Sequence, residues 1–426
     1  MRTMLIRTRV VVALVAAGCA AGGGAAGAEV LTWEACVQEA AANHPDLVAA
    51  RARVDTALAS RRITASGRYP QIRGSVSGRT SDRSGGDRGE SYSSSVSAEQ
   101  LVYDWSQTSY GIKAAEANLK AAQYNYENTS ATVRQRLRSA FVQLVRAQES
   151  LVITEEIGAR RKENVEHVTL RYKAGREHKG SLLTAQANLR AAEYDVAQAK
   201  RTLAVSQRRL SKELGRAELV AIEAKGELEA GEYPAGEIDF VELAERTPTV
   251  KSLEAGTEAA RYEVRSARAN YYPSVSASAS VGTSDSSWPP DEHEWSIGLS
   301  VSVPLSEGGR RKAQVAQARY ALVRTQAEEI GGRDETVLTL EQRWTALEAA
   351  LDEVVVQGQF LEAAEERAAI AQVQYSNGLM SFDNWTIIED ELVRSTKALL
   401  EARANALIAE AEWLQAQGVG LEAAGL

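Results

Sequence analysis

Most of the chain carries apolar residues at helical spacing, in stretches rich in Ala, Glu, Gln, Arg and Leu. Between about 105 and 172 they form two adjacent stripes, one of Leu119, Tyr126, Val133, Ala140 and Ala147 and one of Leu137, Leu144 and Leu151. A second set of stripes contains Ile330, Val337, Trp344 and Leu351, beside Leu340, Leu347, Val354 and Leu361. Two stripes on one helix indicate neighbours on two sides. The pattern predicts a wall of long helices, because an ordinary two-stranded coiled coil explains only one stripe.

Four short segments alternate apolar and polar residues instead. We predict strands at 71–78, 91–102, 274–282 and 294–303. In the last of these, Trp295, Ile297 and Leu299 share a face, and Ser or Gly residues occupy most of the other. A transmembrane strand needs about 9–11 residues with this alternation, whereas a soluble sandwich needs large side chains for a core. The strands are therefore expected to place their apolar face in lipid and their serine face in water inside a barrel.

Aromatic residues mark the strand ends. Tyr69, Tyr271 and Tyr272 precede strands, and Tyr92 and Trp295 lie toward the opposite level, as expected of two interfacial belts. Pro70 and Pro273 end the incoming helices, because proline disfavours helical conformation in the residue before it. Four strands cannot close a barrel, and unpaired edge groups in lipid cost several kcal/mol each. The barrel is therefore expected to be shared in a homo-oligomer.

The sequence repeats itself at a constant offset of 203 positions, which pairs Pro45 with Pro248 and Gly175 with Gly378. Internal repetition of this kind predicts two structural repeats, at about 29–225 and 226–426. Each repeat reads as a helical segment (33–68 or 238–270), two strands, a very long helix, a tip near residue 175 or 378, and a returning helix.

The returning helix, about 180–214, covers only half of the length of the long helix. We expect segment 238–270 to follow the returning helix along the other half, back to the strands. By the same logic, the C-terminal helix at about 380–417 should stack end to end with the N-terminal one.

The first 28 residues resemble a secretory signal peptide, with Arg2, Arg7 and Arg9 before a short apolar run and an Ala-Gly-Ala cleavage site that places the mature start at Glu29. The alternative to this cleavage is lipoprotein-type processing, in which Cys19 is lipidated. After residue 28 there is no run of about 20 apolar residues that predicts a transmembrane helix, and Cys36 is the one remaining cysteine. A disulfide framework is not expected.

Composition argues against several function classes. The 426 residues carry a net charge of −8 without a basic stripe, so no nucleic-acid partner is expected. His44, His167, His178 and His293 are scattered singly, and we expect surface or loop positions for them and no metal site. Glycine-rich stretches lack the Lys-Ser spacing of a phosphate-binding loop. We therefore expect no catalytic residues, no cofactor and no enzymatic activity.

In order and twice over, the motifs resemble the TolC-like outer-membrane efflux family across the whole mature chain. The resemblance is carried by "LTWEACVQEAAANHPDLVAARARV", "YPQI", "YYPSV", "VPLSEGGRRKAQVAQA", "RYKAG" and "QYSNG". It implies a mainly α fold with a transmembrane β-barrel part: a homotrimer whose four strands per chain complete a 12-stranded outer-membrane barrel, continued by long helical hairpins that form a periplasmic tunnel. It also implies a periplasmic adaptor (membrane fusion) protein and an inner-membrane pump as partners, in the outer membrane of a Gram-negative cell.

Two turns resemble the adaptor-contact and gating tips of the family. They contain Tyr172 and Gly175 in the first repeat, and Tyr375, Gly378 and Leu379 in the second. The first tip departs from the usual Gly-Leu pair, because Arg176 follows Gly175, which puts tight docking there in doubt. Asp383 is the candidate acid of a pore constriction, and capping of the following helix is its alternative role.

We interpret the chain as a passive exit duct that receives solute from a pump and adaptor, in tripartite efflux or in type I secretion. The sequence does not select a cargo. The alternative is a periplasmic or secreted coiled-coil scaffold without channel activity, in which the strands are incidental hairpins.

Overall fold

The computed structural model describes residues 29–82, 89–218, 220–229, 231, 236 and 238–422. The signal peptide predicted over residues 1–28, together with Cys19, lies outside the described residues. Cys36 lies inside them as a free, fully buried thiol in the largest apolar core. Packing and hydrogen bonds therefore hold the described part of the chain together.

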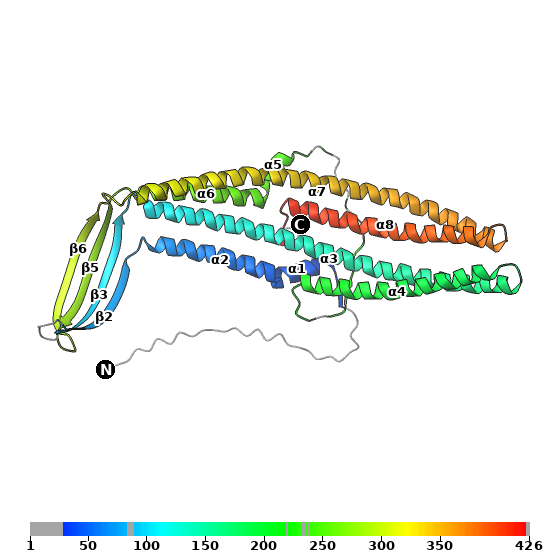
Figure 1. Cartoon of the computed structure of the whole chain (residues 1–426), viewed down its shortest axis with the longest axis horizontal. Helices are drawn as coiled ribbons and strands as arrows, with labels where there is room; N and C mark the ends of the chain where they lie inside the picture. Colours follow the sequence, from blue (N-terminus) through cyan, green and yellow to red (C-terminus); the bar gives the residue numbers. More distant parts are fainter. Residues whose placement is uncertain are drawn as a thin grey trace.

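The molecule is elongated, with a sheet at one end and the turns between helices at the other (Figure 1). The elements follow one another as β1 (Glu29–Leu31), α1 (Trp33–Asn43), α2 (Pro45–Ser66), β2 (Gln71–Ser81), β3 (Gly89–Tyr103), α3 (Gln107–Lys173), α4 (Lys179–Glu213), β4 (Ile222–Ala224), α5 (Phe240–Arg246), α6 (Pro248–Ala269), β5 (Ser274–Asp285), β6 (Glu292–Ser302), α7 (Arg310–Ser376) and α8 (Phe382–Ala416).

Three of the four helices in each half have equal lengths in the two halves. Helices α2 and α6 have 22 residues each, α3 and α7 have 67, and α4 and α8 have 35. Both ends of each pair differ by the same 203 positions that relate the two halves of the sequence. At a rise of about 1.5 Å per residue, α3 and α7 each extend over about 100 Å.

Proline divides the helical segment that precedes the strands in each half. Pro45 and Pro248 are the first residues of α2 and α6, where the missing N–H of proline is tolerated. His44 caps α2, with Nδ1 accepting from the amide of Asp46 at 3.1 Å. Thr247 caps α6, with Oγ1 accepting from the amide of Val250 at 3.4 Å. The helical segments expected over 33–68 and 238–270 each consist of two helices.

The stacking of the short helices differs from the prediction. Helices α2 and α4 follow one another along one side of α3, and α6 and α8 lie between α3 and α7 (Figure 1). Past the end of α4, a Cβ on Gly215 would lie 2.6 Å from the carbonyl oxygen of Asn43, just before α2. Past the end of α8, a Cβ on Gly418 would overlap Pro248, the first residue of α6.

The predictions that α4 continues into α6 and that α8 stacks on the N-terminal helix are thus wrong. The physical reason is that the chain passes from α4 on one side of α3 to α6 on the other (Figure 1). Between these helices in the sequence, strand β4 pairs in parallel with β1. Apolar stripes show which face of a helix is buried, but they do not say which helix buries it.

The largest core lies where these helices meet near the middle of the molecule. It contains Leu137 and Leu144 of α3, Leu210 of α4 and Ile222 of β4, all fully buried. Arg216 closes this region with ion pairs to Glu29 at 2.6 Å and to Glu39 at 2.5 Å. The hydrogen bond from Arg216 holds the pKa of the Glu29 carboxyl below its usual value.

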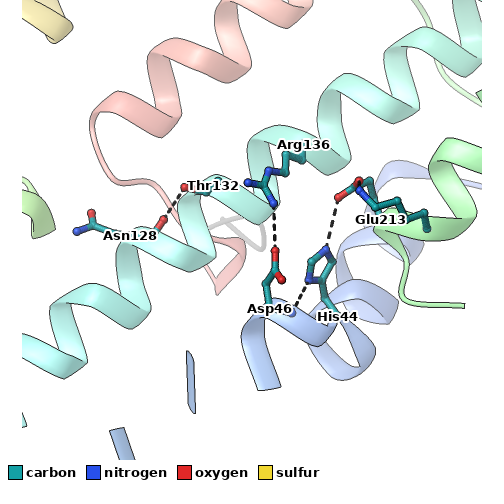
Figure 2. Close-up of polar contacts among 7 residues, drawn as sticks. His44, Asp46, Asn128, Thr132, Arg136 and Glu213 are labelled. Carbon is teal, nitrogen blue, oxygen red and sulfur yellow. Dashed lines mark hydrogen bonds and ion pairs between the residues drawn. The ribbon is translucent and has the colours of Figure 1, made fainter. Parts of the chain in front are cut away.

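Polar contacts connect α2, α3 and α4 beside this core (Figure 2). His44 Nε2 lies 3.5 Å from Glu213 Oε2, and Arg136 Nη1 lies 3.0 Å from Asp46 Oδ2. His44 occupies a loop position between α1 and α2, as one of the two expected alternatives, but only 5% of it is exposed, so a surface position is wrong for this histidine. Its ring is enclosed because the break between α1 and α2 abuts the end of α4.

Strands β2, β3, β5 and β6 form an antiparallel sheet in the order β2-β3-β5-β6. All four strands extend beyond the predicted bounds on the side of the hairpin turns, and β6 ends one residue before its predicted end. Residues 79–81, for example, pair with 89–91. Backbone pairing continues past the last apolar position because it needs no apolar side chains, so the alternating pattern underestimates the length of these hairpins.

Candidate functional site

The two turns between long and returning helices lie together at the end opposite the sheet (Figure 1). Gly175 and Gly378 have φ of +71° and +77°, in the left-handed region that favours glycine. The five residues that the sequence assigns to the tips all lie here. Tyr172 is 40% exposed and Leu379 is 79% exposed.

Tyr375 points inward and joins the two hairpins. It is 3% exposed, and its ring lies flat on that of Trp385, with centroids 4.4 Å apart. The same buried cluster contains Phe382, Val168, Ala185 and Ala371, so it draws residues from both halves of the chain. Tyr375 therefore does not offer its ring to a partner in this arrangement.

Polar groups of the first tip hold Tyr375 in place. Arg171 donates from Nη1 to the Tyr375 carbonyl oxygen at 2.9 Å, and its guanidinium carbon lies 4.6 Å from the centre of the Tyr375 ring. The Tyr375 hydroxyl donates to Glu177 Oε2 at 3.4 Å. Burial, followed by the negative charge of Glu177, raises the pKa of Tyr375 to about 12.

The exposed surfaces of the two tips differ in charge. Lys173, Arg176 and Lys179 are exposed on the first tip, and none of them has an ion-pair partner within the part of the chain that the structure describes. The acid beside them, Glu177, instead bonds to Ser181 Oγ at 2.9 Å and to Tyr375. The second tip exposes Leu379 and has no Lys or Arg of its own between 375 and 384, so one tip is basic and the other apolar.

Asp383 is exposed in the first turn of α8, but it does not cap the helix. Ser381 is the cap, with Oγ accepting from the amide of Asn384 at 3.4 Å. A buried acid farther along α8 was not predicted from the sequence. Glu389 is 9% exposed, and burial raises its pKa although Arg161 and Arg160 lie nearby. Its spacing of four residues from Trp385 places it on the same buried face.

The two faces of the sheet differ as the alternation predicts. On one face, hydroxyl groups meet across the strands, with Oγ–Oγ distances of 2.9 Å for Ser75 and Ser95 and 2.8 Å for Ser77 and Ser93. On the opposite face of β6, Trp295, Ile297 and Leu299 are 70–77% exposed. Large apolar side chains in such a row need lipid or protein to cover them.

Aromatic rings gather at both ends of the sheet. Tyr69, Tyr271 and Tyr272 lie beside Pro70 and Pro273, where helices enter the strands. The sequence analysis missed Tyr103 and Trp105 at this level. The Trp105 ring stacks on Tyr272 at 5.0 Å and meets Tyr103 at 5.4 Å.

At the other end, Trp288 adds to the predicted pair of Tyr92 and Trp295, and its ring lies 5.9 Å from Tyr92. Trp105 and Trp288 stand in turns, outside the alternating pattern that identified the strands.

Among the described residues, the helices include none that is long and apolar enough to cross a bilayer. Within the same ranges, His, Cys, Asp and Glu side chains do not gather in threes that could hold a metal ion.

A family model described as "Outer membrane efflux protein" matches residues 36–216 and 240–419, which together cover most of the chain. The chain belongs to the outer membrane efflux protein family. The first matched segment runs from within α1 to beyond the end of α4, and the second contains α5 to α8. Membership supports an outer-membrane efflux channel and does not support the coiled-coil scaffold.

Individual relatives agree with the family assignment. The outer membrane efflux protein BepC of Brucella suis is 23% identical over 386 residues, which span 88% of this chain and 83% of BepC. Nodulation protein T of Rhizobium leguminosarum is 21% identical over 399 residues, or 90% of this chain and 83% of that protein.

Solved structures establish the fold. A structure of CusC superimposes with a TM-score of 0.81 at 20% identity, covering 90% of this chain and 91% of CusC. The open state of the Neisseria gonorrhoeae MtrE outer membrane channel gives 0.81 at 18% identity, covering 92% of this chain and 89% of MtrE. The efflux protein described here thus has the TolC-like fold and belongs to the outer membrane, with its helices extending into the periplasm.

Proposed function

We propose that three copies of the chain form a passive exit duct, which a periplasmic adaptor and an inner-membrane pump supply with solute. The observation that carries this proposal is the four-stranded sheet with an exposed apolar face and two unpaired edges, β2 and β6. Every unpaired backbone group in lipid costs several kcal/mol. A sheet of this kind therefore needs further copies to close it.

Three copies of the four-stranded sheet supply twelve strands, enough to enclose a lumen. With the apolar face outward, the serine face lines that lumen, and solute crosses the outer membrane among hydroxyl groups. The aromatic residues at both ends of the strands suit the two membrane interfaces.

The helices leave matching edges. Helix α7 forms one side of the helical layer, and α2 followed by α4 forms the other (Figure 1). On α7, large apolar side chains remain exposed, namely Tyr320, Val323, Ile330, Leu338, Val355, Val356, Phe360, Ile370 and Val373. Exposed counterparts on α2 and α4 are Val48, Ile63, Leu183, Tyr194 and Val205. These surfaces support side-by-side packing of α7 against α2 and α4 of the next copy, which continues the barrel as a helical tunnel.

The tips are the proposed contacts with the adaptor and the position of the closed gate. Exposed Leu379 suits an apolar pocket of the adaptor, and the exposed Tyr172 lies on the first tip. The proposed gate includes Tyr375, whose buried ring joins both hairpins, and Asp383 is the proposed pore acid. Relatives named for pyoverdine export and for cation efflux indicate that cargo differs within the family, so the fold does not select one.

A backbone substitution at the second tip tests this assignment. Gly378→Val places a β-branched side chain at a φ of +77°, which strains the turn. We expect pump-dependent export and adaptor crosslinking to fall, at unchanged levels of protein in the outer membrane. Gly256→Val is the matched control, because a Cβ at Gly256 meets no neighbouring atom within 4 Å. Unchanged export with Gly378→Val would place the docking and gating turn elsewhere.

A further inference from the structure

The two edge strands of the sheet carry opposite charges. Arg73 and Arg79 lie on β2, and Glu292 and Glu294 lie on β6. All four side chains are exposed. Charged residues are costly on the lipid face of a strand. Whether these four can form ion pairs on the lumen side therefore depends on the face on which they lie.

The register places all four on the serine face. Ser95 pairs with Ser75 on one side and with Gly282 on the other, and Gly282 pairs with Glu294. These directly opposed residues form one row on one face of the sheet. Side chains two or four positions along a strand share a face. Arg73 and Arg79 therefore share the face of Ser75, and Glu292 shares that of Glu294.

These charges lack partners of opposite sign within the described residues of their own chain. Glu294 accepts a hydrogen bond from Ser284 Oγ at 3.1 Å, a neutral donor. The two arginines stand at one edge of the sheet and the two glutamates at the other, with β3 and β5 between them. Their own chain therefore cannot bring them together while the sheet keeps this order.

The directions of the edge strands suit a meeting between copies. Each neighbouring pair in the sheet is antiparallel, so β2 and β6, three steps apart, run in opposite directions. When β6 of one copy meets β2 of the next, the seam is antiparallel and the serine faces join. The glutamates and arginines then stand on the same side of one strand pair.

We propose that β6 of each copy pairs with β2 of the next, and that Glu292 and Glu294 form ion pairs across this seam with Arg73 and Arg79 on the lumen side. This inference rests on the proposed ring of copies and adds the residues that specify it. Opposite charges across a strand pair are stabilising, and like charges directly opposed are destabilising.

The same arrangement disfavours the wrong assembly. Two β2 edges meeting in a two-fold dimer would bring arginines together, and two β6 edges would bring glutamates together. A head-to-tail contact, which can close into a ring, avoids both. The charges thus stabilise the head-to-tail ring and destabilise the two-fold dimer.

Charge reversal tests the seam. The variants Arg73→Glu with Arg79→Glu, and Glu292→Arg with Glu294→Arg, each place like charges at the seam. The readout is the temperature at which the detergent-extracted, full-length oligomer dissociates. We expect each double variant to lower it by several degrees, or to leave only monomer. Combining all four reversals restores opposite charges, and we expect the dissociation temperature to return toward that of the natural protein.

Glu99→Arg is the matched control, because Glu99 lies on the same face but on the interior strand β3. We expect little change from it. An oligomeric natural protein whose dissociation temperature is unmoved by the double variants, or is not restored by the fourfold variant, overturns the seam and leaves the proposed duct standing. A natural protein that is monomeric after extraction overturns the duct itself.

Discussion

The ring of Tyr375 lies on the indole of Trp385 with 5° between their planes and 4.4 Å between their centroids. These residues stand on opposite sides of the turn at Gly378, so the stack closes the α7–α8 hairpin. Arg171, from the end of α3, covers the Tyr375 ring. The tip of the second half is thereby fastened to the tip of the first.

Removing the Tyr375 ring is expected to loosen this end of the molecule. Truncating a buried aromatic residue to alanine typically costs about 3–5 kcal/mol. We expect Tyr375→Ala to raise the conductance of the closed channel in planar lipid bilayers. Tyr375→Phe keeps the stack and loses only the bond to Glu177, so its conductance should stay near that of the natural protein. Equal conductance for all three proteins would show that the stack does not restrain the gate.

The same tyrosine gives the tip a pH dependence in the alkaline range. Its pKa is raised to about 12 from an ordinary value near 10, because burial and the charge of Glu177 favour the neutral phenol. Stability contributed by the neutral form is complete below about pH 10 and is lost as pH rises toward 12. Conductance that rises only in this interval, and does so less in Tyr375→Phe, is the expected result. A rise at neutral pH would have another origin.

Charge reversal at the first tip should weaken docking of the adaptor. Lys173, Arg176 and Lys179 are exposed cations whose attraction to an acidic surface would be lost on replacement by Glu. We expect crosslinking of the adaptor to fall, and more strongly at low salt, because salt screens exposed charges. Arg190→Glu, higher on α4 and paired with Glu193 at 2.8 Å, is the control. Crosslinking that is insensitive to both the triple reversal and salt would remove the first tip from the docking surface.

Two glycines at the ends of returning helices should be intolerant of a side chain. Gly215 and Gly418 have φ of +77° and +81°, and an added Cβ on either would collide with the chain at the start of α2 or α6. We expect Gly215→Ala and Gly418→Ala each to destabilise the fold by about 1–3 kcal/mol, seen as a lower unfolding temperature. Gly231→Ala, where a Cβ meets no atom within 4 Å, should leave it unchanged. Equal unfolding temperatures would contradict the end-to-end packing.

One strained position can be relaxed. Ser106 has a φ of +67°, and its equivalent in the second half is Gly309 at +88°. A left-handed conformation costs a residue with a side chain roughly 1–2 kcal/mol, and the Ser106 side chain makes no capping bond with α3. Ser106→Gly is expected to raise the unfolding temperature slightly, since added freedom in the unfolded chain offsets part of the gain. Gly309→Ala is the reverse test and should lower it.

Much of the fold could be predicted because its elements are long and repeat. The start of β2 at Gln71 and of β5 at Ser274 follow from Tyr-Pro, and α3 ends within a residue or two of the predicted tip. The stacking of α4 on α2 could not be predicted, since it depends on where the connection near 217–239 leads. The burial of His44 was not predicted for the same reason, because it is created by the end of α4.

The position of the second tip could be predicted from the sequence, but the directions of its side chains could not. Tyr375 and Gly378 were recognised from the turn, yet the inward direction of Tyr375 depends on Trp385 and Arg171. Phe382 and Trp385 after the turn were a signal that could have been read, since two aromatic residues three positions apart favour one buried helix face. Trp105 gave no such signal, because a lone ring in a turn has no periodicity.

The proposed duct requires the four-stranded sheet to be one third of a closed barrel. The number of protomers in the detergent-extracted protein, measured by light scattering on unheated and boiled samples, tests it most directly. We expect a trimer whose β-structure is lost together with the oligomer on heating. A monomer or a dimer with the same β-structure would contradict it.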